Sequence, residues 1–556
     1  MPTNRPWLAH YDPGVPAAID VPDVPIFHLL DEAAARHPDQ ACTVFQDQIV
    51  RFGEMQSLVN RLAAGLQSFG LRKGERVGLF LPNSPQFVLA YYAVLKAGGV
   101  VVAMNPQYKQ RELEFQISDS GARILIALSD AYDLVNTVRD HVQLSAVVLT
   151  RMDDAFDLPS WAAGEQKESA SPVDLAQGDT WLGDVIAAQP LQAQPHGPVS
   201  ADDVAIFQYS GGTTGVPKGA VGLHRNLVAN SLMFRRWLVG LEDGRETTLM
   251  AIPMYHVYGM VVGMSVSILL GAKMVLIPDP RNLGDILRNI ETYQASFFPG
   301  VPTMYALINQ NQDVQAGRYN LRSIRACISG SAPLLREVRV RFEDLTGAKL
   351  MEGYGLSEAP TATHCNPMFG EKRSGSIGLP LPNVDCQIVS LEDGETILAP
   401  GEIGELLIRS PQVMQGYHKM PGETAEALRG GWLHTGDIAR MDEDGYFYIV
   451  DRKKELIKVS GYQVWPREIE EVIAAHPQVR EVSVAGIPDP IRGEAPKAWV
   501  VLQSDASVSK EEIQAWCQEA LIYYKVPIDI EFRESLPRTL VGKILRRELV
   551  RQHLEG

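Results

Sequence analysis

The sequence contains few cysteines. Its 556 residues include five, and none of them lies in a CxxC pair or at another spacing typical of metal sites. They are Cys42, Cys327, Cys365, Cys386 and Cys517. This scarcity excludes a disulfide framework and disfavours a zinc site, so we expect a protein of the reducing cytoplasm.

The chain also lacks a surplus of positive charge. It has 51 lysines and arginines against 67 aspartates and glutamates, which gives a net charge of −16. Because binding to a phosphate backbone needs a surplus of cations, nucleic-acid binding is excluded as the main role. General attachment to anionic lipid is disfavoured for the same reason, and only a weak peripheral contact with the inner membrane face is left open.

No strongly hydrophobic segment opens the sequence, so we expect no signal peptide. Residues 249–272 contain no Asp, Glu, Lys or Arg and are long enough to span a bilayer. Proline, tyrosine, histidine, glycine and serine interrupt this stretch. We therefore predict a buried strand, a turn and a buried helix there instead of a membrane span.

The composition is that of an ordinary globular protein, with 45% hydrophobic and 21% charged residues, and the length predicts two or more domains. Between residues 76 and 150, predicted strands alternate with predicted helices, which is typical of a parallel sheet covered by helices. The strands are predicted at 76–81, 100–104, 123–128 and 146–150, and the helices at 87–96, 112–119 and 132–141.

Beyond residue 150 the pattern changes. Residues 152–200, rich in proline, glycine, serine and glutamine, are interpreted as a surface excursion. Short segments and dense turn signals predict antiparallel β structure over about 375–450. Small helix and strand patterns from residue 468 onward predict a separate domain of about 100 residues. Between these regions, strands are predicted at 248–252, 273–277 and 296–298.

Residues 209–219, YSGGTTGVPKG, carry the parts of a polyphosphate cradle. Glycines allow backbone amides to turn inward, hydroxyl groups add donors, and Lys218 adds a positive charge. The segment is not a Walker loop, because Pro217 and Gly219 flank the lysine; a flexible turn is the alternative interpretation. The predicted phosphate contacts are Ser210, Gly211, Gly212, Thr213, Thr214, Gly215 and Lys218.

Six further segments follow in an order that resembles the adenylate-forming superfamily of acyl-CoA synthetases, luciferases and peptide-synthetase adenylation domains. They are PMYHVYG at 253–259, GYGLSE at 353–358, TGD at 435–437, DR at 451–452, KVSGYQ at 458–463 and PRTLVGK at 537–543. The resemblance covers nearly the whole chain and is strongest to bacterial long-chain fatty-acid:CoA ligases.

The resemblance implies an α/β fold: a large N-terminal region of two stacked α/β subdomains plus a distorted β-barrel, with a small mobile C-terminal α/β domain. The implied bounds are 1–452, with the barrel part at about 375–450, and 453–556, with a hinge near Lys454. The active site is expected in the cleft between them. In the implied reaction, a carboxylate and MgATP give acyl-AMP and pyrophosphate, and the thiol of CoA then gives acyl-CoA and AMP.

Several residues suit the nucleotide and its metal. Tyr354 offers an aromatic face for adenine, although a core tyrosine explains it equally well from the local sequence. Asp437 can accept hydrogen bonds from both ribose hydroxyls, and Arg452 adds donors. Glu358 supplies a hard oxygen ligand for Mg²⁺, which the substrate phosphates would also hold, and Thr213 is the second predicted metal ligand. The resemblance adds contacts by Gly330, Ser331, Ala332, Gly353, Gly355 and Ser357.

Lys543 can reduce the repulsion between an attacking carboxylate and the α-phosphate of ATP, and similar enzymes use the matching lysine in this way. The resemblance also places Lys458 and Gln463 near the adenylate. It gives Gly461 the role of admitting the slender pantetheine of CoA after the C-terminal domain rotates. A lysine acetyltransferase that modifies Lys543 is a further implied partner.

His256 resembles the acyl-pocket histidine of the family, although a lone histidine in an apolar stretch is more often a satisfied core residue. Some long-chain enzymes place a gating tryptophan four residues later, where this chain has Met260, so the resemblance does not extend to their gating residue. We expect a long- or medium-chain fatty acid as substrate. The alternatives are an acyl-AMP ligase that serves a carrier protein, an aryl-acid:CoA ligase, and a non-catalytic nucleotide or acyl-CoA binder.

Overall fold

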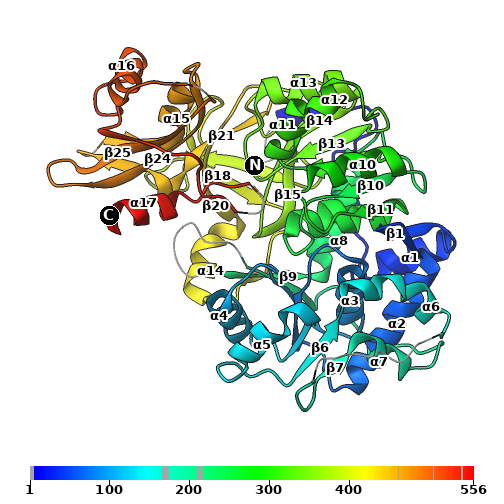
Figure 1. The fold of residues 1–556 in the computed structure, drawn as a ribbon. Helices are drawn as coiled ribbons and strands as arrows, with labels where there is room; N and C mark the ends of the chain where they lie inside the picture. The colour runs from blue at the N-terminus through cyan, green and yellow to red at the C-terminus, as the bar shows by residue number, and fades with distance from the viewer. Residues whose placement is uncertain are drawn as a thin grey trace.

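The computed structural model describes residues 5–165, 174–209, 217–460, 462–504, 506–539 and 542–555, with the side chain of Gln463 left out. These residues form a large N-terminal body and a smaller C-terminal part beside it (Figure 1). The body contains sheets of nine, eight and four strands, and the smaller part contains one sheet of five. The predicted mixed α/β fold class is confirmed.

The eight-stranded sheet confirms the predicted alternation of strands and helices. Its strands are β3 (Arg76–Phe80), β4 (Val100–Ala103), β5 (Ile124–Leu128), β6 (Ala146–Thr150), β7 (Thr180–Trp181), β8 (Val204–Tyr209), β9 (Gly219–Leu223) and β19 (Gly416–Tyr417). Their order is β19-β9-β8-β4-β3-β5-β6-β7, and the strands from β8 to β7 pair in parallel. The intervening helices are α3 (Pro85–Lys96), α4 (Gln110–Ser120) and α5 (Tyr132–Arg139).

The interpretation of residues 152–200 as a surface excursion is wrong in part. This region contains α6 (Leu158–Ala162) and α7 (Leu182–Ala187), and β7 between them extends the sheet beside β6. Trp161, Leu182 and Ile186 are buried. The sequence pattern missed these elements because each is shorter than the stretch over which hydrophobic periodicity can be read.

The nine-stranded sheet lies against the first one through a shared layer of helices. Its strands are β1 (Ala41–Phe45), β2 (Gln48–Arg51), β10 (Thr247–Met250), β11 (Lys273–Leu276), β12 (Phe297–Gly300), β13 (Ala326–Ser329), β14 (Lys349–Leu356), β15 (Ala359–Cys365) and β16 (Leu379–Pro380). A single buried cluster joins Phe45 and Met274 of this sheet, Val77 and Val101 of the other, and Leu89 of α3. The two α/β units are therefore stacked.

The helices that accompany this second unit begin near the N-terminus and continue past residue 220. They are α1 (His28–Arg36), α2 (Phe52–Ser68), α8 (His224–Trp237), α9 (Val266–Leu270), α10 (Leu283–Tyr293), α11 (Pro302–Gln310), α12 (Gln312–Gln315) and α13 (Arg336–Thr346). Figure 1 shows α10 to α13 together beside β13 and β14, in the upper part of the body.

The uncharged stretch 249–272 folds as a buried strand, a turn and a buried helix, as predicted. The strand is β10, and the helix begins with a π-helical segment, η4 (Gly259–Ser265), which continues into α9. A side chain at Gly259 would place its Cβ 2.2 Å from the carbonyl oxygen of Pro253, so this close turn requires glycine. None of the helices in the described ranges combines the length and hydrophobicity needed to cross a bilayer.

The region predicted as antiparallel β structure contains a four-stranded antiparallel sheet. Its strands, in the order β17-β18-β20-β21, are β17 (Asp385–Val389), β18 (Gly404–Arg409), β20 (Leu433–Met441) and β21 (Phe447–Arg452), and a short helix, α14 (Pro421–Ala427), precedes β20. The N-terminal η1 (Pro6–His10) covers this sheet, because the buried Trp7 packs edge-on against Phe447 with ring centroids 6.1 Å apart.

The C-terminal part has its own sheet and core. Its strands are β22 (Ile457–Val459), β23 (Tyr462–Val464), β24 (Val479–Asp489), β25 (Gly493–Leu502) and β26 (Asp529–Phe532), and its helices are α15 (Pro466–Ala474), α16 (Lys510–Ala520) and α17 (Arg546–Glu555). Ile469, Val484, Val500 and Ile513 belong to one buried cluster within it. An independent domain starting at residue 453 remains a prediction.

Two arginines dock the C-terminal part against β21. The Arg467 guanidinium donates to the Ile449 carbonyl at 2.6 Å, and the backbone N–H of Arg467 donates to the Asp451 carboxylate at 2.9 Å. That carboxylate therefore caps the first turn of α15 from across the chain connection. Arg546 pairs with Glu470 at 2.7 Å and lies 3.9 Å from Asp451. These contacts fix one orientation of the smaller part.

Candidate active site

Asp437 and Arg452 lie directly opposite each other on β20 and β21. Arg452 Nε is 3.0 Å from Asp437 Oδ1, and the hydroxyl of Tyr354 on β14 donates to Oδ2 of the same carboxylate. The charge of Asp437 raises the pKa of Arg452. Burial raises the pKa of the Tyr354 hydroxyl, and the Asp437 charge raises it further. Because two donors from different strands hold it, the Asp437 carboxylate keeps one orientation, as a ribose-binding group requires.

Glycines bring the backbone close around Tyr354. A Cβ at Gly355 would lie 1.6 Å from the Thr361 carbonyl oxygen, so β15 can pass beside this strand only if the residue is glycine. At the end of β13, Gly330 is buried against the Tyr258 ring, and Ser331 adopts a left-handed φ of 70°. The predicted nucleotide-binding segments thus lie side by side in one sheet: 330–332 directly follows β13, and 353–357 forms the end of the neighbouring β14.

Glu358 lies in the turn between β14 and β15 and is half-buried. Its Oε1 accepts a hydrogen bond from the Tyr417 hydroxyl at 2.8 Å, and its carbonyl oxygen accepts the Met414 N–H, also at 2.8 Å. Within the described ranges, no cluster of three or more His, Cys, Asp or Glu side chains could hold a metal alone. A single anchored carboxylate does fit Mg²⁺, which is commonly shared between one or two carboxylates and substrate phosphates.

β8 and β9 form an antiparallel pair that ends at Tyr209 and Gly219, so the predicted phosphate loop connects them. Residues 210–216, including the predicted Ser210, Gly211, Gly212, Thr213, Thr214 and Gly215, lie outside the described residues. Lys218 is described: its ammonium pairs with Glu423 of α14 and lies 5.1 Å from the centre of the Tyr417 ring. The Tyr209 hydroxyl donates to Asp119 at 2.6 Å and anchors the other end of the loop.

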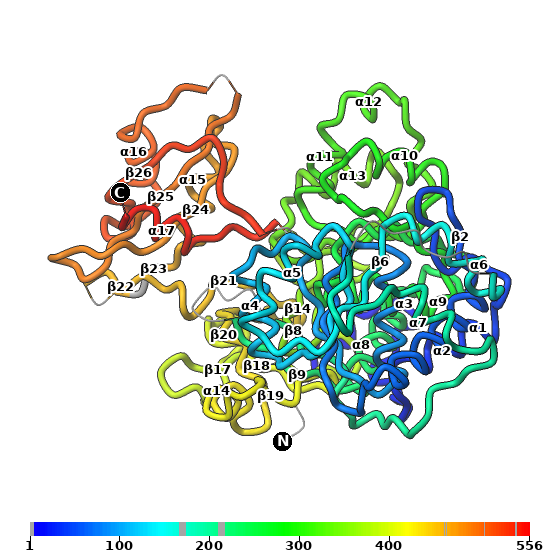
Figure 2. The backbone as a smooth tube through the Cα atoms, turned by 60° about the horizontal axis from the view of Figure 1, so that its bottom comes forward, coloured from blue at the N-terminus to red at the C-terminus, as the bar shows by residue number. Residues whose placement is uncertain are grey.

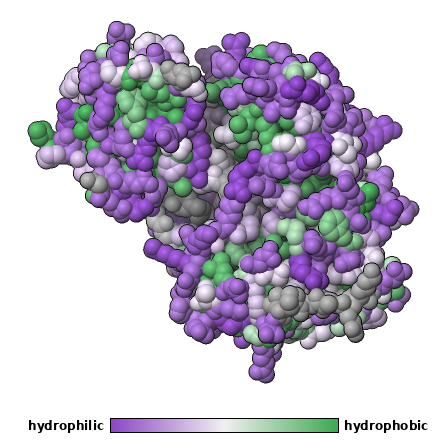
Figure 3. Space-filling model, in the orientation of Figure 1, coloured by the Kyte–Doolittle hydropathy of each residue, from purple (hydrophilic) through white to green (hydrophobic). Residues whose placement is uncertain are grey.

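Lys543 of the C-terminal part reaches the same group of residues. Figure 2 shows the segment before α17 extending from the smaller part toward the body, and Figure 3 shows a hollow between the two parts. Burial and the Arg452 charge lower the pKa of Lys543 to about 8, against the opposing effects of Asp437 and Glu358. Gly542 supports this turn with a φ of 78°, a conformation that suits glycine.

His256 and Met260 lie on successive turns where the chain enters η4. Met260 is fully buried, and its N–H donates to the His256 carbonyl at 2.9 Å. His256 is half-buried, and its Nδ1 accepts the Tyr258 N–H at 3.2 Å. Burial and the nearby Lys543 charge lower the pKa of His256 to about 4, so its ring is neutral at pH 7 and suits a pocket wall.

Lys458, the second lysine predicted near the adenylate, does not join this group of residues in the present orientation. Lys458 on β22 is exposed, and its backbone N–H donates to Glu494 at 2.8 Å within the C-terminal part. Gly461 and the Gln463 side chain lie outside what the structure describes. Lys454 is exposed in a short 3₁₀ turn, η6 (Lys453–Glu455), directly after Arg452. The structure therefore groups Lys543, and not Lys458, with Asp437, Arg452 and Glu358.

Sequence reasoning did not single out Tyr417, Glu423 or Asp119. Tyr417 is 59 residues from Glu358, Glu423 is 205 residues from Lys218, and Asp119 is 90 residues from Tyr209. These contacts exist only because β19 pairs with β9 and α4 lies near the end of β8. No local pattern of residue types could have revealed them.

Comparison with known proteins agrees with this geometry. The family model described as AMP-binding enzyme matches residues 30–418, and the AMP-binding enzyme C-terminal domain matches residues 468–543. A long-chain-fatty-acid–CoA ligase of Bacillus subtilis is 40% identical over 100% of this chain and 99% of its own length. One of Salmonella typhimurium is 39% identical over 98% of each chain.

Solved structures show the same architecture. ATP-bound MatB from Rhodopseudomonas palustris superposes with a TM-score of 0.83 at 28% identity, over 95% of this chain and 99% of that one. The anthranilate CoA ligase AuaEII, in complex with anthranoyl-AMP, gives a TM-score of 0.82 at 26% identity, over 96% and 98% of the two chains. The chain belongs to the AMP-binding enzyme family.

Proposed function

We propose that this chain is an ATP-dependent fatty acid:CoA ligase acting on long- or medium-chain acids. A carboxylate displaces pyrophosphate from ATP to give acyl-AMP, and the CoA thiol then displaces AMP to give acyl-CoA. The observation that carries this proposal is that the charge of Lys543, which belongs to the C-terminal part, interacts with the charges of Arg452, Asp437 and Glu358 in the N-terminal body. The two similar ligases named above, over their full lengths, support the fatty-acid substrate.

Each residue has a task in the first step. Asp437, oriented by Tyr354 and Arg452, accepts hydrogen bonds from the ribose hydroxyls. The Lys543 ammonium lies between two anions and stabilises the charge that develops as the carboxylate attacks the α-phosphorus. Mg²⁺, held by Glu358 with Thr213 and the substrate phosphates, would neutralise phosphate charge when bound.

The second step needs a different arrangement. A thiol must reach the acyl carbonyl from a direction that the Lys543 segment blocks, so we propose that the C-terminal part rotates about Lys454. Rotation would bring the segment of Lys458, Gly461 and Gln463 to the adenylate, where Gly461 leaves room for pantetheine. The exposed position of Lys458 in the present orientation supports this proposal.

The acyl chain is proposed to pass beside His256 and Met260. The neutral imidazole and the buried thioether form an apolar wall, and methionine adapts readily to chains of different shape. A cytoplasmic location, with weak contact to the membrane face where fatty acids partition, completes the proposal. The free, buried state of all five cysteines agrees with a reducing compartment.

Pyrophosphate release with and without CoA, measured across a panel of acids, tests the function. We expect release with C8 to C18 fatty acids and formation of acyl-CoA when CoA is present. Release that is followed by transfer only to a carrier protein would identify an acyl-AMP ligase. A preference for benzoate-type acids would identify an aryl-acid ligase, and nucleotide binding without any release would identify a binding protein.

Replacing Glu358 by glutamine should raise the Mg²⁺ concentration for half-maximal adenylation by about tenfold, the scale of one lost charged interaction. The amide keeps the size of the side chain but removes the charge. A Mg²⁺ titration of pyrophosphate release measures the change. Glu426→Gln on the exposed face of α14 is the matched control, and an unchanged midpoint in Glu358→Gln would remove this carboxylate from the metal site.

Acetylation of Lys543 should abolish adenylation, because it removes the positive charge that the first step uses. Protein treated with a lysine acetyltransferase is expected to lose pyrophosphate release, and a deacetylase should restore it. Lys543→Arg cannot be acetylated and so should keep whatever activity it has under the same treatment. Full activity in protein acetylated at Lys543 would contradict this regulation.

A further inference from the structure

One side chain contacts two of the residues predicted to bind ATP. The Tyr417 hydroxyl donates to Glu358 Oε1 at 2.8 Å, and the Lys218 ammonium lies over the face of the same ring, 5.1 Å from its centre. Glu358 is the proposed metal ligand, and Lys218 is the proposed phosphate contact. Tyr417 itself has neither role, but it contacts both residues.

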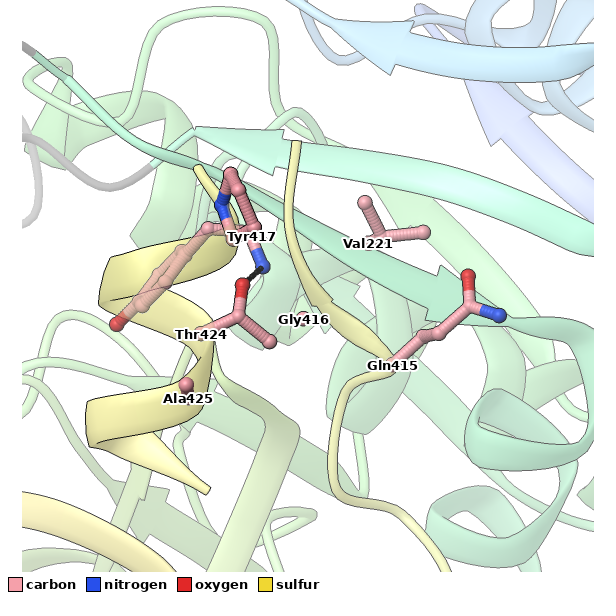
Figure 4. Close-up of a pocket in the computed structure, with 7 residues that line it drawn as sticks. Val221, Gln415, Gly416, Tyr417, Thr424 and Ala425 are labelled. Carbon is pink, nitrogen blue, oxygen red and sulfur yellow. Dashed lines mark hydrogen bonds between the residues drawn. The ribbon is translucent and has the colours of Figure 1, made fainter. Parts of the chain in front are cut away.

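The backbone holds Tyr417 firmly in this position. β19 pairs with β9, so that Tyr417 lies opposite Ala220 just beyond the phosphate loop. The Tyr417 N–H donates to Thr424 Oγ1 at 2.8 Å, which joins the strand to α14 (Figure 4). Gly416 makes this possible, because a Cβ there would lie 2.5 Å from the Thr424 methyl group. The residues around this contact border a pocket of about 320 Å³.

The same helix supplies the counter-ion of Lys218. Glu423, one residue before Thr424, forms an ion pair with Lys218, and this pairing lowers the pKa of the Glu423 carboxyl. Glu423 is exposed whereas Lys218 and Tyr417 are half-buried, so the lysine is held from both sides near the protein surface. A cation over an aromatic face and a charged hydrogen bond are both directional contacts.

We propose that Tyr417 is a positioning residue that couples the metal-binding carboxylate to the phosphate-binding lysine. Its hydroxyl fixes the direction of the Glu358 carboxylate, and its ring fixes the approach of Lys218, so the two halves of the MgATP site are formed together. Glu423 keeps Lys218 in place until the triphosphate draws it away. This inference deepens the proposed function and rests on it for the identity of the nucleotide.

Two substitutions separate the two contacts. Tyr417→Phe removes only the hydrogen bond to Glu358, whereas Tyr417→Leu also removes the aromatic face under Lys218. Tyr417→Phe should raise the Mg²⁺ concentration for half-maximal ATP binding by roughly three- to tenfold, with ATP affinity at saturating Mg²⁺ changed less than about twofold. Tyr417→Leu should show the same Mg²⁺ shift and also weaken ATP binding at saturating Mg²⁺ by roughly threefold or more.

A matched control exists in β21. The Tyr448 hydroxyl donates to the Asp442 carboxylate at 3.0 Å, and the Arg440 guanidinium lies 4.1 Å from its ring centre. Tyr448→Phe therefore deletes the same kind of contact outside the proposed ATP site, and it should leave the Mg²⁺ midpoint unchanged. In the Glu358→Gln background, Tyr417→Phe should add less than about a twofold further shift, since both changes act through one carboxylate.

Equilibrium binding of ATP to the full chain, titrated with Mg²⁺ in the absence of any acid, is the measurement. Equal Mg²⁺ midpoints for wild type and Tyr417→Phe would overturn the inference, as would equal shifts in Tyr417→Phe and Tyr448→Phe. Thermal melting should show all variants folded at the assay temperature; if Tyr417→Leu unfolds, Tyr417→Phe alone decides. Because no acid is present, failure of the ligase activity in the acid panel is a separate result.

Discussion

Lys543→Ala should reduce acyl-adenylate formation by about 100-fold or more, the scale expected for the loss of one preorganised electrostatic donor. Lys543 is the cation of the C-terminal part whose charge interacts with Asp437, Arg452 and Glu358, and the proposed first step brings two anions together at this point. The second step starts from an uncharged acyl carbonyl after the proposed rotation. Formation of acyl-CoA from supplied acyl-AMP should therefore change little.

Single-turnover pyrophosphate release measures the first step, and acyl-CoA formed from added acyl-AMP measures the second. Lys510→Ala, which removes an exposed lysine of the same part, is the matched control and should leave both unchanged. An equal loss in both steps for Lys543→Ala, or no loss in either, would show that the lysine has another role.

The pH profile of the first step should report the same group. Burial and Arg452 lower the pKa of Lys543 to about 8, so the free enzyme loses this cation as the pH rises through that value. The kcat/KM for ATP should fall accordingly above about pH 8. Lys543→Arg stays charged in this range, and whatever its absolute rate, its profile should lack the decline.

Lys454→Pro should stop the enzyme after its first step. Lys454 is the second residue of the 3₁₀ turn η6, and the φ range typical of a 3₁₀ helix includes the value of about −65° that proline requires. A fixed φ prevents the large backbone rotation that we propose for the second step. Pyrophosphate release in one turnover should persist and acyl-AMP should remain bound, while acyl-CoA formation falls by about 100-fold or more, as for a blocked conformational step.

Lys454→Ala distinguishes the effect of a fixed backbone φ from the effect of losing the lysine side chain. It removes the charge but leaves φ free, so both half-reactions should stay within about threefold of wild type, since exposed charge contacts contribute little. Acyl-CoA formation at the wild-type rate in Lys454→Pro would place the hinge at another residue. The same low rate in both variants would instead assign the effect to the lysine side chain.

Sequence patterns predicted the regular part of the fold well because periodicity is a local property. The alternation from β3 to β6 could be read directly, since each strand is a short apolar run and each helix is long enough to show its spacing. The two residues of β7 and the six of α7 were missed, because their burial depends on the neighbouring β6 and α2 and not on a pattern of their own.

In the candidate site too, residues within local sequence segments were predicted, and residues whose partners are distant in sequence were missed. Asp437, Arg452, Glu358 and Lys543 were predicted from short segments that resemble known motifs, and in the structure the first three residues influence the pKa of Lys543 through their charges. Which of the two lysines, Lys543 or Lys458, faces these residues in the present orientation could not be predicted, because it depends on how the C-terminal part docks against the body, which no short segment encodes alone. Tyr417 was missed because its partners are distant in sequence.

The arginine contacts between Arg467 and β21 have a consequence for the order in which substrates bind. If the C-terminal part turns about Lys454 as proposed, these contacts must open first, and charged hydrogen bonds of this kind are each worth about 1.5 to 3 kcal/mol. Under this proposal, the orientation that accepts CoA would be a minor population of the resting enzyme. If it amounts to about one molecule in a hundred, the apparent dissociation constant of CoA is about a hundredfold above its intrinsic value. CoA would therefore bind weakly until acyl-AMP has formed. Ordered substrate binding would then follow from the two hydrogen bonds between Arg467 and β21, and not from the CoA pocket itself.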